Sequence, residues 1–241
     1  MTHSKTLAAA ALSAATLLSG TMGAHAARAA DPAFNPKDLT GVWFQTSGGK
    51  FGKYPFTPEY EAQAEKRRKA MAAGNPYQPA GSSCLPRGLV GMITTGAYPL
   101  EIFQSPREVA VNKENGGMHR IWLNRPHQAP ADLTPMFFGD SVGHWEGNVL
   151  VVDTISLGAT DNLDGQNPHS DALHVVEKYQ RTSPTTLQVE VIVDDAKALT
   201  KPVSTIASFR LDPTYEMQEY YCVNERNLIL GDKQVVAGAS K

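Results

Sequence analysis

The clearest hydrophobic pattern in the chain is an alternation of apolar and polar residues between positions 186 and 195. In TLQVEVIVDD, apolar side chains occupy every second position from Leu187 to Val193, and Gln188 and Glu190 lie between them. Such alternation is typical of a strand with one buried face. Comparable short stretches, separated by turn residues, are GVWFQT, YPLEIFQS, REVAVNK, MHRIWLN, MFFGDSVGHW, VLVVDTISL, LHVVEKYQR, STIASFRLD and MQEYYCVNE.

One stretch has a helical pattern instead, FTPEYEAQAEKRRKAMAAG, and it predicts a helix over about 57–73. Thr57 can cap its start, Pro58 occupies the first helical position and Gly74 follows its last turn. Many short strands with a single helix predict a mainly β protein, in which an antiparallel meander closes into a lipocalin-like barrel. A β-sandwich is the alternative architecture.

The beginning of the chain has the features of a secretory signal peptide over residues 1–26. Lys5 precedes an Ala- and Leu-rich run, and the run ends in the Ala24-His25-Ala26 pattern of a cleavage site. We expect cleavage after Ala26, with a site near Ala30 as the alternative. The mature protein is then expected in the periplasm or outside the cell.

Beyond the leader, the sequence predicts an extended lead-in over 27–40, one lipocalin-like β domain over 41–230 and a C-terminal tail over 231–241. The formal net charge of −2 gives no electrostatic footprint for nucleic acid. No later stretch reaches the roughly 18 consecutive apolar residues of a transmembrane helix. We therefore expect neither a nucleic-acid partner nor a membrane span, and the oligomeric state stays open.

The chain contains two cysteines, Cys84 and Cys222. In an oxidising compartment, an even number of cysteines far apart in sequence favours a disulfide bond between them. The alternative is a pair of buried thiols.

Two features of the chain resemble known proteins. Gly41-Val42-Trp43 in the first strand, followed by a meander, is similar to lipocalins and their calycin relatives. GHWEGNVLVVDT (143–154) and PHSDALHVVEKY (168–179) resemble the signature stretches of a large, mostly uncharacterised family of secreted bacterial lipocalin-like proteins, over about 38–227. That family usually has an acidic residue where Asn148 stands. The resemblance implies a barrel with an internal cavity and no particular reaction.

Candidate chemistry centres on five histidines between positions 119 and 174. His119 shares strand parity with Ile121, and His174 shares it with Val176, so both are expected to face the barrel interior. An imidazole in an apolar cavity can act as a general acid or base. The catalytic candidates are His144, His169, His174 and Asp161, with a purely structural role as the alternative for each; His127, in a proline-rich loop, has the weakest claim.

The candidate ligand-binding residues are His119, Trp122, Trp145, Glu177 and Tyr179. The two tryptophans could form a stacking wall, with core packing as the alternative. Parity places Glu177 and Tyr179 opposite to His174, so the three cannot face one cavity without a bulge. No nucleotide-binding or nucleophile motif is present, and no cofactor is predicted. A metal held by converging histidines is the alternative, although no metal-ligand spacing supports it.

Three functions fit these patterns. One is a cofactor-independent lyase, isomerase or hydrolase that uses histidine acid–base chemistry on an apolar or aromatic substrate. Another is a non-catalytic carrier or scavenger of a hydrophobic ligand. The third, an envelope interaction protein with a filled barrel, is disfavoured because polar side chains on inward faces cost stability unless they serve a purpose.

Overall fold

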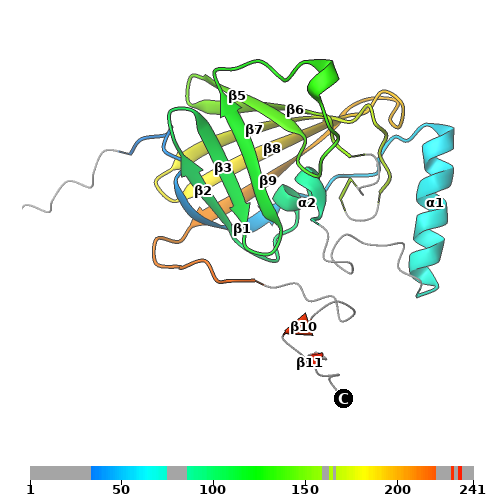
Figure 1. Ribbon diagram of the computed structural model, residues 1–241, viewed down its shortest axis with the longest axis horizontal. Coiled ribbons are helices and arrows are strands. Elements are labelled where there is room, and N and C mark those ends of the chain that lie inside the picture. Colours follow the sequence, from blue (N-terminus) through cyan, green and yellow to red (C-terminus); the bar gives the residue numbers. More distant parts are fainter. Residues whose placement is uncertain are drawn as a thin grey trace, which may run out of the picture. The chain divides into compact units, whose positions relative to one another are not determined.

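The structure is a computed structural model that describes residues 34–74, 86–158, 163–164 and 167–220, together with the backbone of 229–230 and 233–234. Nine strands form a closed barrel in the order β1 to β9 (Figure 1). They are β1 Gly41–Gly48, β2 Leu100–Gln104, β3 Glu108–Lys113, β4 Gly117–Leu123, β5 Asp140–Glu146, β6 Val149–Ile155, β7 His174–Ser183, β8 Thr186–Asp194 and β9 Val203–Leu211. A separate pair joins β10 (Ile229–Leu230) to β11 (Lys233–Gln234). The predicted mainly β, barrel-type fold is confirmed.

Strands β4 and β5 are parallel, whereas the other neighbouring pairs around the described barrel are antiparallel. Directions that alternate around a ring require an even number of strands, so a nine-stranded barrel needs a parallel pair. Parallel neighbours cannot be joined by a tight turn. The proline-rich segment 124–139, here called the crossover, makes this connection and contains the short 3-10 helix η1 (Pro130–Asp132). It runs along the top of the barrel in Figure 1.

The barrel core is built by the alternation seen in the sequence. Leu187, Val189, Val191 and Val193 of β8 all have fully buried side chains. Trp43 in β1 is also fully buried, and its indole nitrogen donates a hydrogen bond to the carbonyl of Leu39 at 2.8 Å. These side chains belong to one continuous hydrophobic cluster.

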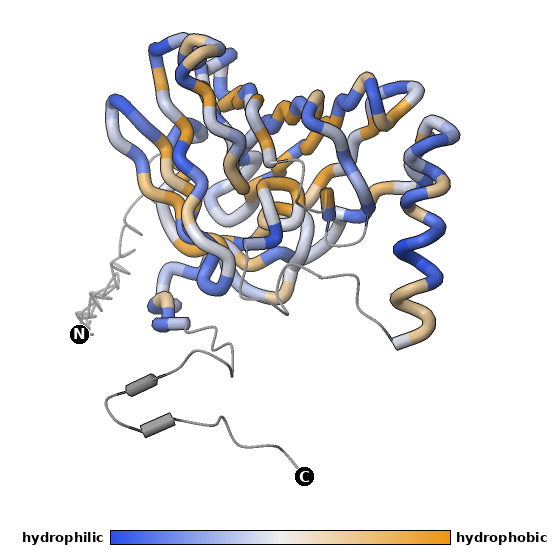
Figure 2. The backbone as a smooth tube through the Cα atoms, turned by 45° about the vertical axis from the view of Figure 1, so that its right-hand side comes forward, coloured by the Kyte–Doolittle hydropathy of each residue, from blue (hydrophilic) through white to orange (hydrophobic). Residues whose placement is uncertain are grey.

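The structure contains two α-helices among the described residues. α1 (Pro58–Ala72) agrees with the prediction, although the Thr57 hydroxyl donates to the carbonyl of Lys197 instead of capping the helix. Figure 2 shows α1 as mostly hydrophilic and the barrel strands as alternating. α2 (Gly88–Thr94) was not predicted, because its short apolar run has no helical periodicity; all seven of its residues are buried.

The last predicted strand, MQEYYCVNE, is not formed where the structure describes it. Met217–Tyr220 have no regular secondary structure, and the rest of that stretch lies outside the described residues. The barrel is already closed by the pairing of β1 with β9, so the sheet offers no free edge to a further strand.

Candidate functional site

A pocket of about 550 Å³ lies between the outer face of β4 and the crossover. Its walls are mainly apolar and aromatic. They are formed by Met118, Arg120, Trp122, Gln128, Pro135, Met136, Phe137, Phe138, Gly139, Asp140 and Gly158. We call this the crossover pocket.

The local sequence explains why these side chains meet. Alternation along β4 turns Met118, Arg120 and Trp122 outward, while His119 and Ile121 turn inward. The parallel pairing of β4 with β5 forces the crossover to pass over this outer face. The crossover thereby supplies the opposite wall.

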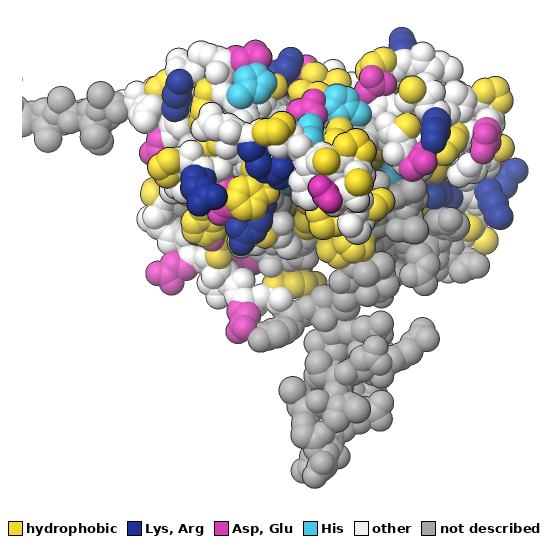
Figure 3. All heavy atoms as spheres, turned by 45° about the horizontal axis from the view of Figure 1, so that its top comes forward, with side chains coloured by type: hydrophobic (Ala, Val, Ile, Leu, Met, Phe, Trp, Pro, Cys, Tyr) yellow, Lys and Arg dark blue, Asp and Glu magenta, His cyan; other side chains and the backbone are white. Residues whose placement is uncertain are grey.

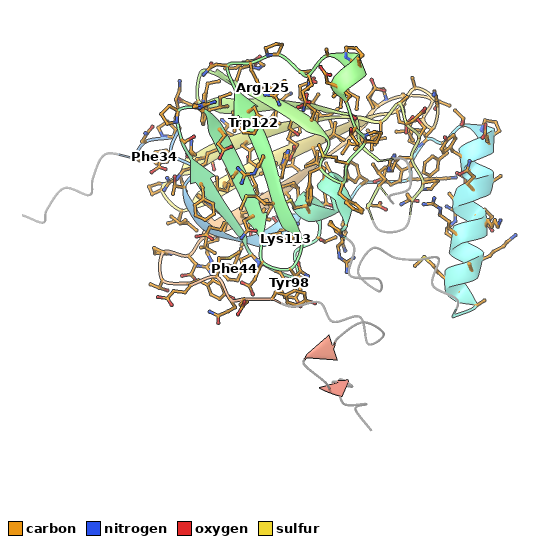
Figure 4. The ribbon with its side chains drawn as sticks, in the orientation of Figure 1. Phe34, Phe44, Tyr98, Lys113, Trp122 and Arg125 are labelled. Atoms are coloured by element: carbon orange, nitrogen blue, oxygen red, sulfur yellow. The ribbon has the colours of Figure 1, made fainter. Side chains whose placement is uncertain are left out.

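Arg125 lies beside Trp122 near the end of β4 (Figure 4). Its guanidinium carbon is 5.5 Å from the centroid of the Trp122 ring, within the range of a cation–π contact. The same guanidinium donates to Asp140 at 2.6 Å. Arg125 therefore links the Trp122 wall of the crossover pocket to Asp140.

A series of acidic and basic side chains, each hydrogen-bonded to the next, extends from the crossover pocket across the outer barrel surface. We call it the outer chain: Arg125, Asp140, His127, Asp153 and His174. The two ring nitrogens of His127 lie 2.9 Å from an Asp140 oxygen and 2.8 Å from an Asp153 oxygen. The second Asp153 oxygen is 2.7 Å from Nε2 of His174. Histidine and acidic side chains lie next to one another on the face shown in Figure 3.

Hydrogen bonding keeps the acids of the outer chain ionised. Burial raises the pKa of Asp140, but hydrogen bonds from the Gln128 amide, Arg125 and His127 outweigh it and lower this pKa to about 2. Burial likewise raises the pKa of Asp153, and bonds from His127 and His174 lower it overall. Each ring nitrogen of His127 faces a carboxylate oxygen, so the outer chain alternates between acidic side chains and the side chains that hydrogen-bond them.

A second polar cluster lies inside the barrel, on the other face of the same strands. Nε2 of His119 is 2.8 Å from the Ser141 hydroxyl, which also accepts a 2.8 Å hydrogen bond from Thr154. Ser141 donates in turn to the carbonyl of Phe138 at 3.3 Å. His119 and Thr154 are fully buried, and Ser141 is nearly so.

Glu177 and Tyr179 of β7 complete the inner cluster. The Tyr179 hydroxyl donates to Oε1 of Glu177 at 2.7 Å, and both residues are fully buried. Oε2 of Glu177 lies 3.8 Å from Nδ1 of His119, and neither atom has a hydrogen-bond partner. Burial raises the pKa of Glu177 to about 8, against the opposing hydrogen bond from Tyr179, and lowers that of His119 to about 3. Near neutral pH the inner cluster is therefore uncharged.

The structure separates the residues that the sequence grouped as a site. His144 is exposed and pairs with Glu146 at 2.9 Å on the β5–β6 hairpin, away from the crossover pocket. His169 is buried, and its Nδ1 is 2.8 Å from the carbonyl of Ser170. Trp145 is half-buried and packs against the core, with the Lys37 ammonium 5.6 Å from its ring.

The expected orientation of His174 was wrong. Its side chain is 38% exposed and belongs to the outer chain, whereas Glu177 and Tyr179 point inward as parity required relative to it. The inward position of His119 agrees with the structure. The face of β7 was assigned from Val176, whose side chain is only half-buried, while Val175 is the fully buried residue of that pair.

Sequence reasoning missed most of the outer chain. The available signal was Asp153, the one acid within the apolar strand β6, whereas Asp140 only opens the more polar strand β5. Their partner His127 lies in the crossover, and only the parallel pairing of β4 and β5 brings that segment over β5 and β6.

Several predicted features fall outside the described residues. These are Asp161, both cysteines (Cys84 and Cys222) and the leader with its cleavage sites. In the part of the chain that the structure describes, no three or more His, Cys, Asp or Glu side chains are arranged to hold a metal ion. Within the same ranges, no helix has the length and apolar character needed to cross a membrane.

Comparison with known proteins adds no relative. No protein-family model, no curated protein and no solved structure matches the chain. Function must therefore be argued from the two polar assemblies and from the pocket that borders them.

Proposed function

We propose that this protein binds a small, largely apolar or aromatic molecule in the crossover pocket. The observation that carries the proposal is the pocket itself, about 550 Å³ with Trp122, Phe137 and Phe138 among its walls. Small-molecule sites typically have 300–1,000 Å³ and mostly apolar linings with a few placed polar groups. Met118 and Met136 at its border are 40% and 48% exposed, so a ligand would cover apolar surface that now faces water.

The charged groups of the pocket favour a ligand without net charge. Arg120 is paired with Glu108 at 3.1 Å, and Asp140 is paired with Arg125 and His127. A charged ligand would have to compete with these pairs. A neutral ligand leaves them intact and gains from the aromatic walls.

A second candidate function is cofactor-independent acid–base catalysis on the same molecule, as a lyase, isomerase or hydrolase. Two pairs of a histidine and a carboxyl group beside the pocket support it. His127 and Asp140 lie at its edge, and His119 and Glu177 lie beneath Phe138. Of these groups, Glu177 has its pKa raised to about 8, close to neutral, where a carboxyl group can give up and take back a proton.

The sequence supports the parts of the proposal that concern the location of the protein and the proteins it resembles. The leader and the resemblance to secreted lipocalin-like proteins support a periplasmic or secreted binding protein, and export supports a Cys84–Cys222 disulfide. A carrier or scavenger of hydrophobic molecules in that compartment is the simplest activity consistent with the crossover pocket.

The test is a calorimetric titration of the protein with 2-ethylnaphthalene, a neutral aromatic probe. We expect saturable binding to the wild type, and at least tenfold weaker binding to Trp122→Ala, which removes an aromatic wall. Phe103→Ala is the matched control, because Phe103 is an exposed aromatic on β2 that lies outside the pocket. Equal weakening in both variants, or no saturable binding by the wild type, would contradict the proposal.

The catalytic candidate is tested on the same samples. Probes and any molecule that copurifies with the protein are incubated with it and analysed by mass spectrometry and chromatography. Formation of an isomer, a dehydrated product or a hydrolysis product that is lost in His127→Gln would support catalysis. A bound molecule recovered unchanged would support the carrier.

A further inference from the structure

Two unpartnered polar atoms face each other inside the barrel, next to the crossover pocket. They are Nδ1 of His119 on β4 and Oε2 of Glu177 on β7, 3.8 Å apart on fully buried side chains. Buried polar groups are nearly always hydrogen-bonded, and an unmet one costs stability. The 3.8 Å separation places both atoms within reach of one shared hydrogen-bonding partner.

The surrounding hydrogen bonds fix which of these atoms donates. Ser141 uses its only hydrogen on the Phe138 carbonyl, so His119 must donate to Ser141 from Nε2. Nδ1 of His119 is then an acceptor. Tyr179 donates to Oε1 of Glu177, so the proton of the neutral carboxyl group resides on Oε2, which is a donor.

One acceptor and one donor that face the same point are complementary to a hydroxyl group, which can donate to the first and accept from the second. An oxygen placed about 2.8 Å from each atom, an ordinary hydrogen-bond length, fits the 3.8 Å separation. A carboxylate would face the lone pair of Nδ1, and an ammonium group would face the hydrogen on Oε2.

Phe138 separates this point from the crossover pocket. Its side chain lines the pocket, packs against the barrel core, and stacks on the His119 ring with centroids 6.3 Å apart. The β4 neighbours of His119, Met118 and Arg120, line the same pocket on the outer face. Phe138 is therefore a side chain that contacts both the crossover pocket and the His119 ring.

We propose that His119 and Glu177 form a hydroxyl-binding site that selects a neutral alcohol or phenol among the molecules entering the crossover pocket, with Phe138 as the movable wall. This inference rests on the proposed function, because the apolar part of the ligand occupies that pocket. It names the chemical class of the ligand: an aromatic or apolar body that carries one uncharged hydroxyl group.

The experiment compares two probes that differ by one group. 2-Naphthalenemethanol and 2-ethylnaphthalene exchange a hydroxyl for a methyl group, and each is titrated into the full-length protein at pH 6. We expect the alcohol to bind at least tenfold more tightly, because the hydrocarbon cannot satisfy the two buried atoms. Equal affinities would overturn the inference and leave the proposed function standing. No binding of either probe would overturn both.

Variants of Glu177 test whether its Oε2 atom causes the preference for the alcohol over the hydrocarbon. Glu177→Gln places an N–H donor where the protonated oxygen was, so it should keep the preference for the alcohol within about threefold. Glu177→Met, of similar length, should abolish the preference while 2-ethylnaphthalene still binds. Phe103→Ala is the matched control, because Phe103 is exposed on β2 outside the pocket, and it should keep the preference for the alcohol.

Each remaining outcome has a clear meaning. If Glu177→Met does not fold, two other variants test the inference. Glu177→Gln must keep the preference for the alcohol, and Phe138→Ala must bind the alcohol with a faster association rate. A preference that survives in Glu177→Met, or is lost in Glu177→Gln with the fold intact, would show that the alcohol is recognised elsewhere.

Discussion

The inner cluster and the outer chain both contain histidine and carboxyl groups, and they use opposite faces of β5, β6 and β7. Asp140 and Ser141 are adjacent on β5, and Asp153 and Thr154 are adjacent on β6; in each pair the acid faces outward and the hydroxyl inward. The outer acids have lowered pKa values, whereas the pKa of Glu177 inside is raised to about 8. Strand parity therefore decides which carboxyl groups are charged.

The difference follows from the cost of moving a charge out of water. Outside, the buried Asp140 is met by Arg125 and His127, and the 40% exposed Asp153 is met by His127 and His174. Inside, burial outweighs the contacts that His119 and Glu177 make with other described residues, so both are neutral near pH 7. The outer chain suits electrostatic anchoring of the crossover, and the inner cluster suits recognition of a neutral group.

The largest expected effect comes from the hub of the inner cluster. Ser141→Ala leaves Nε2 of His119 and the Thr154 hydroxyl without their partner in a dry interior, and should lower the free energy of unfolding by about 2–4 kcal/mol. Urea denaturation measures it. The control is Ser204→Ala on β9, an exposed serine expected to change stability by less than about 0.5 kcal/mol. Equal effects in both variants would mean that the buried hydroxyl contributes nothing specific.

The pH dependence of the free energy of unfolding should show that Glu177 and His119 are both neutral near pH 7, unlike the ionised acids of the outer chain. The pKa of Glu177 is raised from 4.5 to about 8, so its stabilising contribution is complete below pH 4.5 and declines as the pH rises toward 8. Relative to the wild type, Glu177→Gln should gain roughly 1 kcal/mol per pH unit over that window. His119, with its pKa lowered from 6.5 to about 3, contributes above pH 6.5 and loses its contribution toward pH 3.

Denaturation curves of the wild type and Glu177→Gln at pH 5, 6, 7 and 8 test this expectation. Parallel pH profiles would show that Glu177 titrates as an exposed acid does, and the contrast between the two faces would fail.

The smallest expected effect lies in the outer chain. Asp153→Asn weakens the bonds to His127 and His174, but the Asp153 side chain is 40% exposed and screened by water, so the loss should be only about 0.5–1 kcal/mol at low salt. In 1 M NaCl the loss should shrink further. The destabilisation by Ser141→Ala should not change with salt, apart from the general effect of salt on both proteins. A large, salt-independent loss in Asp153→Asn would place Asp153 with the buried groups.

The sequence by itself determined the nine barrel strands, the helix α1 and the mainly β class, although it also predicted a strand from Met217 that is not formed in its described part and left a sandwich open. Alternation in β8 and the capping signals around 57–74 are local, and each is readable without knowing what packs against it. The sequence also identified His119, Trp122, Glu177 and Tyr179 as candidates. It could not show which face of β7 is buried, because the adjacent Val175 and Val176 point to opposite faces of the strand.

Only the tertiary structure decided where the pocket lies and which histidines meet which acids. The parallel pairing of β4 with β5 follows from closing an odd number of strands, a property of the whole ring that no single segment encodes. That closure carries the crossover over β4, brings His127 to Asp140 and Asp153, and sets Phe138 against His119. Tertiary structure also decided the helix α2. Its short apolar run has no helical periodicity of its own, and burial in the core stabilises it.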